Sequence, residues 1–194
     1  MNWQARLEIY AGFSHYYQGQ YQQAGLLSTK VRDYLTNWGA GETLESAGKH
    51  DDLDSLEFEY NRLFVGPGKL LAPPYEGAYR NADRLLMQEE TMAVRAFYRR
   101  CGIAVKRESA IPDDHLGFEL EFVSYLLFHM IRSDKDPDAR ARLLGLYGEF
   151  FRQHLCQWVY LHCQDVLAHA KNRLCREMAI LLSGFLQREE LNLR

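Results

Sequence analysis

Several signals that would assign this chain to a common class of protein are missing from its sequence. The 194 residues include only four cysteines, and no two of them form a Cys-x-x-Cys pair. Reduced thiols in the cytoplasm are therefore expected. A phosphate-binding Gly-x-x-x-x-Gly-Lys loop is absent, as is a Gly-x-Gly-x-x-Gly turn after a strand. The sequence thus offers no nucleotide-binding motif.

Long hydrophobic runs are missing as well. The most apolar stretch, residues 125–131, is short and contains His129, so we expect no membrane span. Residues 1–8 do not show a basic segment leading into an apolar core, which argues against a secretory signal and favours the cytoplasm. The net charge of −3 argues against non-specific binding of nucleic acid.

The negative charge that is present is unevenly distributed. Residues 42–59 contain seven acids and one base, and residues 108–121 contain five acids with no Lys or Arg. Solvated helix faces and helix N-caps account for part of this excess. The remainder is consistent with a positively charged partner.

Hydrophobic residues are abundant and follow a helical pattern. They make up 47% of the chain, and aromatic residues make up 13%. Apolar residues recur every three or four positions in nearly every segment, and no alternating run of β-branched residues is present. We predict an all-α protein, a single helical bundle of about eight helices that forms one domain over residues 1–194.

Capping residues and helix breakers set the expected helix boundaries. The helix that starts at residues 112–114 is apolar around much of its circumference and is expected to be central and buried. The other expected boundaries are a stop at residues 39–41, a start at Asp51 or Asp52 with a stop at Gly66, a start at Asn81 or Asp83 with a stop near Cys101, a start at Asp136-Pro137, and a short break near His154.

Pairs of histidine and aspartate suggest one enzymatic alternative. His50 with Asp51, and Asp114 with His115, have the ligand types of an all-helical His-Asp metal-dependent phosphohydrolase. Asp114 precedes its histidine, which is the wrong order for such a site, and His50 lies in a polar loop. We therefore expect a non-enzyme with no catalytic residue, no metal and no cofactor, and keep the phosphohydrolase as a distant alternative.

The most informative segment is the end of a predicted helix followed by a loop. The helix ends at Gly66-Pro67-Gly68, and the loop contains two consecutive prolines, Pro73 and Pro74. Residues 59–68 are EYNRLFVGPG and residues 72–77 are APPYEG. Proline fixes φ and restricts the residue before it, so the loop should be stiff and present Tyr75 and Glu76 at its tip. Leu63 and Phe64 have helical spacing and fit either the core or the floor of a groove beside these residues.

These residues resemble the signature of the TorD/DmsD family of chaperones for molybdenum-containing redox enzymes. That signature has an aromatic residue, two further positions, Leu-Phe, Gly-Pro, and then Ala-Pro-Pro-Trp-Glu-Ser. Residues 112–122 (PDDHLGFELEF) and 150–158 (FFRQHLCQW) resemble two further family segments, in the family's order. Tyr75 replaces the usual Trp, Gly77 replaces the usual Ser, and Asp113 is an additional acid.

The resemblance implies a cytoplasmic, all-helical chaperone with no catalytic activity. Its partner would be the twin-arginine signal peptide of an immature molybdopterin-dependent oxidoreductase, in its apo form. The chaperone would hold that enzyme back from export until cofactor insertion and folding. An alternative is an assembly chaperone for a molybdoenzyme subunit that is not exported. The sequence leaves open a monomer or a domain-swapped dimer.

The chemistry of the candidate site residues fits such a peptide. Aspartate accepts the planar fork of an arginine in two charge-assisted hydrogen bonds, and histidine can donate or accept beside it. An N-cap is the structural alternative for Asp114. The predicted signal-peptide-binding residues are Leu63, Phe64, Pro73, Pro74, Tyr75, Glu76, Asp113, Asp114 and His115.

Overall fold

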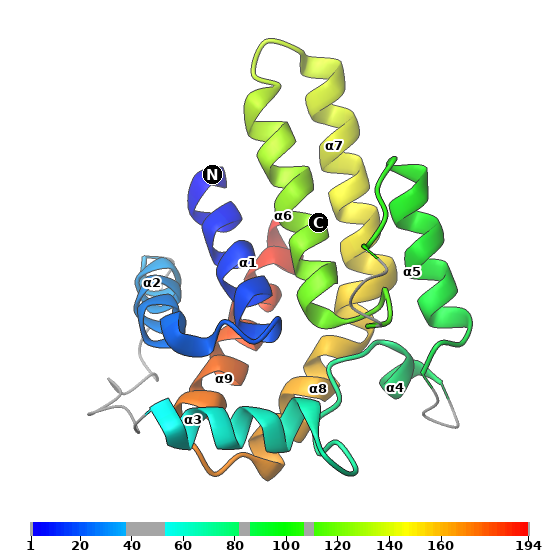
Figure 1. Ribbon diagram of the computed structural model, residues 1–194. Helices are drawn as coiled ribbons and strands as arrows, with labels where there is room; N and C mark the ends of the chain where they lie inside the picture. Colours follow the sequence, from blue (N-terminus) through cyan, green and yellow to red (C-terminus); the bar gives the residue numbers. More distant parts are fainter. Residues whose placement is uncertain (1, 38–52, 82–85, 107–110, 194) are drawn as a thin grey trace. The chain divides into compact units, whose positions relative to one another are not determined.

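The computed structural model describes residues 2–37, 53–81, 86–106 and 111–193, and these residues are helical nearly throughout (Figure 1). They contain eight α-helices of at least eight residues and a single-turn helix, α4, so the all-α prediction and the expected helix number are confirmed. Within these ranges there is no strand, only an isolated bridge between Tyr75 and His115. The helices are α1 (Trp3–Tyr17), α2 (Ala24–Thr36), α3 (Leu53–Tyr60), α4 (Gly77–Arg80), α5 (Glu89–Arg100), α6 (Leu116–Arg132), α7 (Pro137–Phe150), α8 (Cys156–His169) and α9 (Arg173–Asn192).

The predicted start of α7 is confirmed in detail. Asp136 is its N-cap and accepts a hydrogen bond from Ala139 N at 3.0 Å, with Pro137 in the first turn. The helix beginning at residue 53 continues through a π-helical segment, Asn61–Val65, and ends at Gly66, where φ is +107°. Glycine adopts this left-handed φ without steric cost, which explains the predicted stop.

The predicted start of the fourth helix is wrong. Asn81 is extended, with φ −84° and ψ 132°, and α5 begins only at Glu89. Met87 has a positive φ of 60°, which a right-handed helix cannot accommodate, so the helical turn of α4 cannot run on into α5. Asp83 and the expected boundaries at residues 39–41, Asp51 and Asp52 lie outside the described residues.

The expected break near His154 is a change of helix type. The chain stays helical from Pro137 to His169, but residues Phe151–Leu155 form a π-helical segment between α7 and α8. A π-segment adds a residue to the turn and shifts the side chains that follow it. Its buried side chains include His154.

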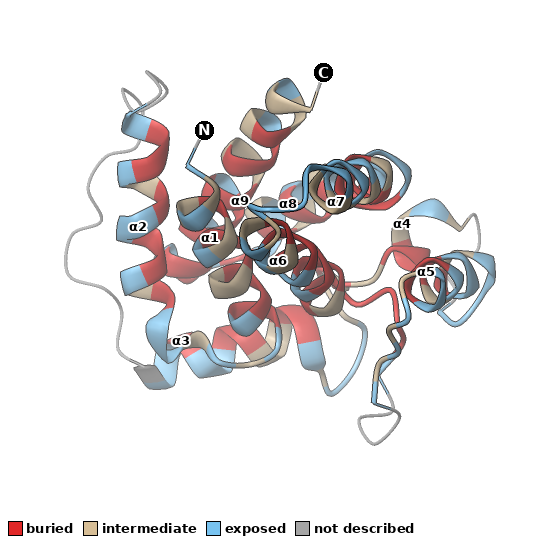
Figure 2. Cartoon of the chain, turned by 90° about the horizontal axis from the view of Figure 1, so that it is seen from above, coloured by how far each residue is buried: buried red, intermediate tan, exposed pale blue. Residues whose placement is uncertain are grey.

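The described chain forms two compact units, and each has its own interior. The first consists of residues 1–14 and 74–159 and the second of residues 15–73 and 160–194. The prediction of one domain over residues 1–194 stays a prediction. In the first unit α6 packs along α7, and the predicted inner side of α6 is buried (Figure 2). That buried side comprises Leu116, Leu120, Val123, Leu127 and Met130.

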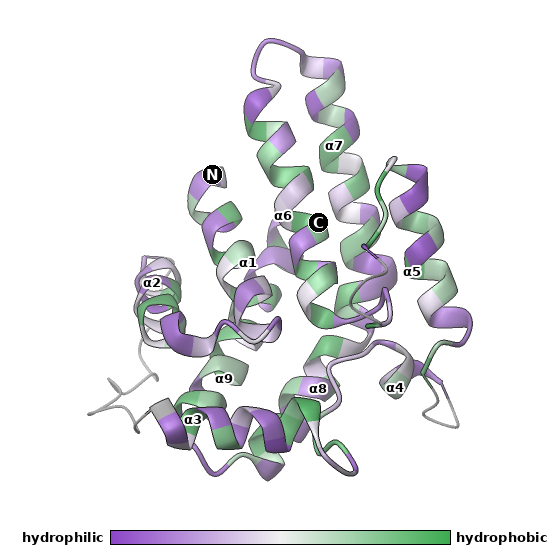
Figure 3. Ribbon diagram, in the orientation of Figure 1, coloured by the Kyte–Doolittle hydropathy of each residue, from purple (hydrophilic) through white to green (hydrophobic). Residues whose placement is uncertain are grey.

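The second unit is built around α9, which packs against α2 and α3. The hydrophobic end of the helical segment that begins with α3 (Figure 3) supplies Leu63 and Phe64 to its core. Glu59, one turn earlier, accepts hydrogen bonds from the backbone N–H of Asn172, at 3.2 Å, and of Lys171. This carboxylate therefore ties the segment before the glycine stop to the start of α9.

No described helix combines the length and apolar character that a membrane crossing requires.

Candidate functional site

Two segments of the resemblance, far apart in the sequence, pair with each other in the first unit. Leu116 N donates to Pro74 O at 2.9 Å, and Glu76 N donates to Asp114 O at 3.1 Å. The rings of Tyr75 and His115 lie edge to face, 5.2 Å apart. Residues 74–76 and 114–116 thus form one small extended ladder, which we call the motif ladder. The two segments predicted to act together are therefore in direct contact.

Asp114 is a buried hydrogen-bond acceptor within this ladder. Its Oδ2 accepts from Gly77 N and its Oδ1 from Thr91 Oγ1, both at 2.8 Å, and the residue is fully buried. It therefore caps α4, a different helix from the one predicted. Burial raises the pKa of Asp114, and the hydrogen bonds from Gly77 and Thr91 oppose that rise. Both carboxylate oxygens already have a partner before any peptide binds.

His115, not Asp114, is the N-cap of α6. Its Nδ1 accepts from Gly117 N at 3.1 Å, and the residue is only 6% exposed. Burial lowers the pKa of His115 to about 4, so the imidazole is neutral at pH 7.

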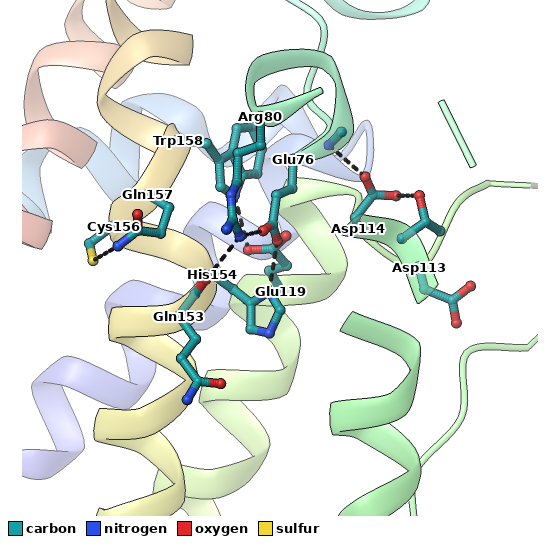
Figure 4. A network of polar contacts seen from close by, with 12 residues as sticks. Glu76, Arg80, Asp113, Asp114, Glu119, Gln153, His154, Cys156, Gln157 and Trp158 are labelled. Carbon is teal, nitrogen blue, oxygen red and sulfur yellow. Dashed lines mark hydrogen bonds and ion pairs between the residues drawn. The ribbon is translucent and has the colours of Figure 1, made fainter. Parts of the chain in front are cut away.

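We expected Glu76 at the tip of an exposed loop, but the residue is fully buried. Its carboxylate forms an ion pair with Arg80 and contacts His154 Nδ1 at 2.9 Å (Figure 4). Arg80 also donates to Gln153 O at 3.0 Å. The loop thus directs this acid inward, toward the π-helical segment that carries His154. Pro74 is buried as well, whereas Tyr75 is half-buried.

Sequence reasoning missed two residues beside Glu76. Glu119 is fully buried and accepts from Trp158 Nε1 at 3.3 Å through one oxygen. Its other oxygen, Oε1, has no hydrogen-bond partner among the described residues. Burial, and then the nearby carboxylates of Glu76 and Asp114, raise the pKa of Glu119 well above its usual value. The signal was present, since both Glu119 and Trp158 lie in the segments that carry the resemblance.

Asp113, the additional acid, lies nearest to solvent of the three acids predicted for the site. Its side chain is 11% exposed and forms an ion pair with Arg95, whose side chain is 31% exposed. Arg95 Nε lies 2.9 Å from Asp113 Oδ2. An arginine of the chain itself thus already binds this carboxylate in the way predicted for a peptide arginine.

The remaining predicted residues belong to the second unit. Leu63 is fully buried and Phe64 is 3% exposed, so both are core residues and do not form a groove floor in this conformation. Pro73 is half-buried. The Phe64 ring lies edge-on to Tyr17 and Tyr60, with centroids 5.5 Å and 5.0 Å away. Core packing at helical spacing explains both positions.

The residues proposed for the metal-enzyme alternative are engaged in other contacts. Asp114 and His115 use their polar atoms in the hydrogen bonds above. In the described ranges no group of three His, Cys, Asp or Glu side chains is arranged to hold a metal ion. His50 and Asp51 lie outside those ranges.

Comparison with known proteins places the chain in a family. Residues 20–164 match the family model described as nitrate reductase delta subunit, which represents the TorD/DmsD type of chaperone. The chain belongs to this family, and the resemblance found in the sequence is confirmed.

Curated relatives agree with this assignment. A probable Tat proofreading chaperone DmsD of Haemophilus influenzae is 25% identical over 135 residues, covering 70% of this chain and 60% of that protein. A chaperone protein TorD of Vibrio atlanticus is 24% identical over 179 residues, covering 83% of each chain. A Tat proofreading chaperone DmsD of Salmonella typhimurium is 32% identical over 73 residues, covering 38% of this chain and 36% of that protein.

Proposed function

We propose that this protein is a cytoplasmic, non-enzymatic chaperone that binds the twin-arginine signal peptide of an immature molybdopterin-dependent oxidoreductase. Binding would hold that client back from export until its cofactor is inserted and it has folded. Membership of a family that contains Tat proofreading chaperones supports this proposal. The observation that carries it is the motif ladder, in which two signature segments pair and leave Tyr75 and the Asp113–Arg95 pair at its margin.

The acids of the site suggest an exchange mechanism. Glu76 and Asp113 each bind an arginine of the chain itself, Arg80 and Arg95 respectively. An incoming peptide arginine would take over the carboxylate of Asp113, because the Asp113–Arg95 pair is partly open to solvent whereas Glu76 is fully buried. The exchange keeps the number of charge-assisted hydrogen bonds constant, so neither acid is left unpaired.

The other predicted residues take supporting roles in this proposal. Pro74, Asp114 and His115 hold the ladder in place through the contacts described above. Tyr75 offers a half-buried ring to the apolar part of the peptide that follows its arginines. Leu63 and Phe64 contribute to the interior of the second unit, and Pro73 stands next to Pro74 at the start of the ladder segment.

Replacing Arg95 tests the exchange directly. With Arg95→Ala the competitor is gone, and we expect a synthetic twin-arginine signal peptide to bind up to about tenfold tighter in isothermal titration calorimetry. Arg99→Ala is the matched control, because Arg99 is an exposed arginine of the same helix. A peptide with two lysines in place of the arginines should gain much less, since lysine lacks the planar fork.

Unchanged or weaker binding by Arg95→Ala, in a variant with a wild-type helical spectrum, would show that Asp113 does not receive the peptide arginine. The same calorimeter separates the two kinds of client. An apoenzyme that binds equally well after deletion of its signal peptide would favour the assembly chaperone for a client that is not exported.

A further inference from the structure

An open cavity of about 680 Å³ lies in the first unit, and Arg80 and His154 form part of its lining. Its walls come from α4, α5, the π-helical segment and the start of α8. In Figure 1, α5 runs beside α7, and the ion pair between Arg100 and Glu149 at 2.8 Å joins these two helices. We call this cavity the arginine groove. Its lining residues are Arg80, Ala93, Ala96, Phe97, Arg100, Arg152, Gln153, His154 and Gln157.

The charge of this lining is opposite to that of the chain. Three arginines line the groove and no Asp or Glu is among its lining residues, although the whole chain has a net charge of −3. Phe97, Ala93 and Ala96 provide an apolar surface between the charged side chains. Arg80 and Arg100 are paired with Glu76 and Glu149, which lie outside the lining, so the excess positive charge comes from Arg152. This charge disfavours a twin-arginine peptide here, so the surface is distinct from the one proposed above.

The contacts of Arg100 and Arg80 place these two guanidinium groups at different points of the groove. Arg100 stacks over the Phe97 ring at 4.1 Å and pairs with Glu149. Arg80 is fixed on Gln153 O, one helical turn further along from Glu149. Four residues of helix correspond to about 6 Å, so these cations face different parts of any bound chain.

Arg152 is the cation most available to a ligand. The residue is exposed, and its guanidinium lies over Gly148, where an added Cβ would come within 3.1 Å of Nη1. No ion pair or hydrogen bond of this guanidinium is formed within the described ranges, in contrast to Arg80 and Arg100. An arginine of this kind can take up a carboxylate without giving up an internal partner.

We propose that the arginine groove binds an acidic, amphipathic segment of a partner protein. One carboxylate would pair with Arg152, while others would lie near Arg100 and Arg80, which keep their internal partners. The apolar side chains of the segment would lie on Ala93, Ala96 and the small exposed part of Phe97. A single phosphate would favour donors converging on one anion, whereas this groove spaces its cations along an apolar floor. The amides of Gln153 and Gln157 offer further hydrogen bonds to the bound backbone.

Fluorescence anisotropy with a labelled synthetic peptide tests this proposal. The probe is a short helical peptide with Glu and Leu at alternating three- and four-residue spacing, and its control has Gln at every Glu position. We expect the Glu peptide to bind at least about tenfold tighter than the Gln peptide at low salt, and this advantage to shrink at high salt. Arg152→Glu should remove most of the advantage.

Arg99→Glu is the matched control, since it makes the same charge change at an exposed position of α5 that does not line the groove. Arg152→Ala provides a milder variant, and circular dichroism verifies the fold of each. Equal binding of the Glu and Gln peptides, or equal losses from Arg152→Glu and Arg99→Glu, would overturn the proposal. So would displacement of the Glu peptide by tripolyphosphate at concentrations far below those of the peptide itself, which would identify a phosphate site. None of these outcomes depends on the twin-arginine peptide.

Discussion

The two halves of one signature segment use opposite kinds of packing. Residues 60–66 place Leu63 and Phe64 among aromatic rings in the core of the second unit. Residues 74–77 place Glu76 among the polar groups of Arg80 and His154 in the first unit. Dispersion and the burial of apolar surface hold the first half, and contacts of this kind do not exchange one partner for another. Charge-assisted bonds hold the second half, and such bonds can change partner. The comparison teaches that the aromatic half maintains the fold, whereas the polar half can respond to a ligand.

The largest effect should come from opening the aromatic half. Phe64→Ala removes a ring that contacts Tyr17, Tyr60 and His162, and we expect it to lower the free energy of unfolding by about 3–5 kcal/mol. Urea denaturation followed by circular dichroism measures this. The adjacent Val65→Ala, at a side chain 63% exposed, is the control and should change stability by less than about 0.5 kcal/mol. Similar small values for both variants would mean that the ring is not a core element.

A smaller loss of stability is expected in the polar half from Asp114→Ala. The substitution leaves the buried Gly77 N–H and the Thr91 hydroxyl without their acceptor, at a cost of about 2–4 kcal/mol. Thr91→Val removes only one of these bonds and should cost less. Asp134→Ala serves as the control, because that side chain is 76% exposed and its ion pair with Arg140 contributes little. If Asp114→Ala weakened peptide binding while leaving stability unchanged, the residue would be a direct ligand and our structural assignment would be wrong.

The pH dependence of stability should reveal Glu119, whose pKa is raised in part by Glu76 of the polar half. The pKa of Glu119 is raised in the folded protein above its usual value of 4.5, so the folded state binds this proton more tightly than the unfolded chain does. The corresponding stabilisation is fully present below pH 4.5 and is lost as the pH rises toward the raised pKa. We expect Glu119→Gln, which stays neutral, to flatten this decline by up to about 1.4 kcal/mol per pH unit.

Urea denaturation at a series of pH values from mildly acidic to mildly basic measures this difference. Glu121→Gln is the matched control, since Glu121 is an exposed glutamate on the same helix. Parallel stability curves for wild type and Glu119→Gln would contradict the raised pKa.

Local signals in the sequence predicted the fold well. Asp136-Pro137 and Gly66 act on the backbone next to them, so their roles as start and stop are confirmed. Asp114 was harder, because Asp is a preferred N-cap residue, yet the neighbouring His115 caps α6. Its true partners, Gly77 and Thr91, lie 37 and 23 residues away. Which of two adjacent caps faces a neighbouring helix depends on tertiary packing, and a single sequence does not contain that information.

The sequence predicted the candidate site only in part, again because tertiary packing decides the rest. The resemblance assigned residues of both signature segments to one site, and the structure brings residues 74–76 and 114–116 together. The burial of Glu76 depends on His154, which is 78 residues away, and on the π-helical segment that turns His154 inward. The two prolines predicted a stiff loop, but they did not predict which way the Glu76 side chain points. The exposure of the predicted acids was therefore overestimated, and their role in peptide binding stays a prediction.

The smallest effect on stability, and the sharpest test of the comparison, should come from Tyr75. Its ring is half-buried against His115, so Tyr75→Ala should cost about 1 kcal/mol or less. Under the proposed function the same variant should weaken twin-arginine peptide binding about equally at low and high salt, because apolar burial is not screened. Asp113→Asn should weaken binding mainly at low salt. Tyr125→Ala is the matched control, since the Tyr125 ring in α6 lies 4.3 Å from the His129 ring, tilted against it, and the residue is 40% exposed. Equal loss of peptide affinity in Tyr75→Ala and Tyr125→Ala would mean that a tyrosine–histidine pair at the ladder has no special role, and the peptide surface would have to be sought away from residues 74–77.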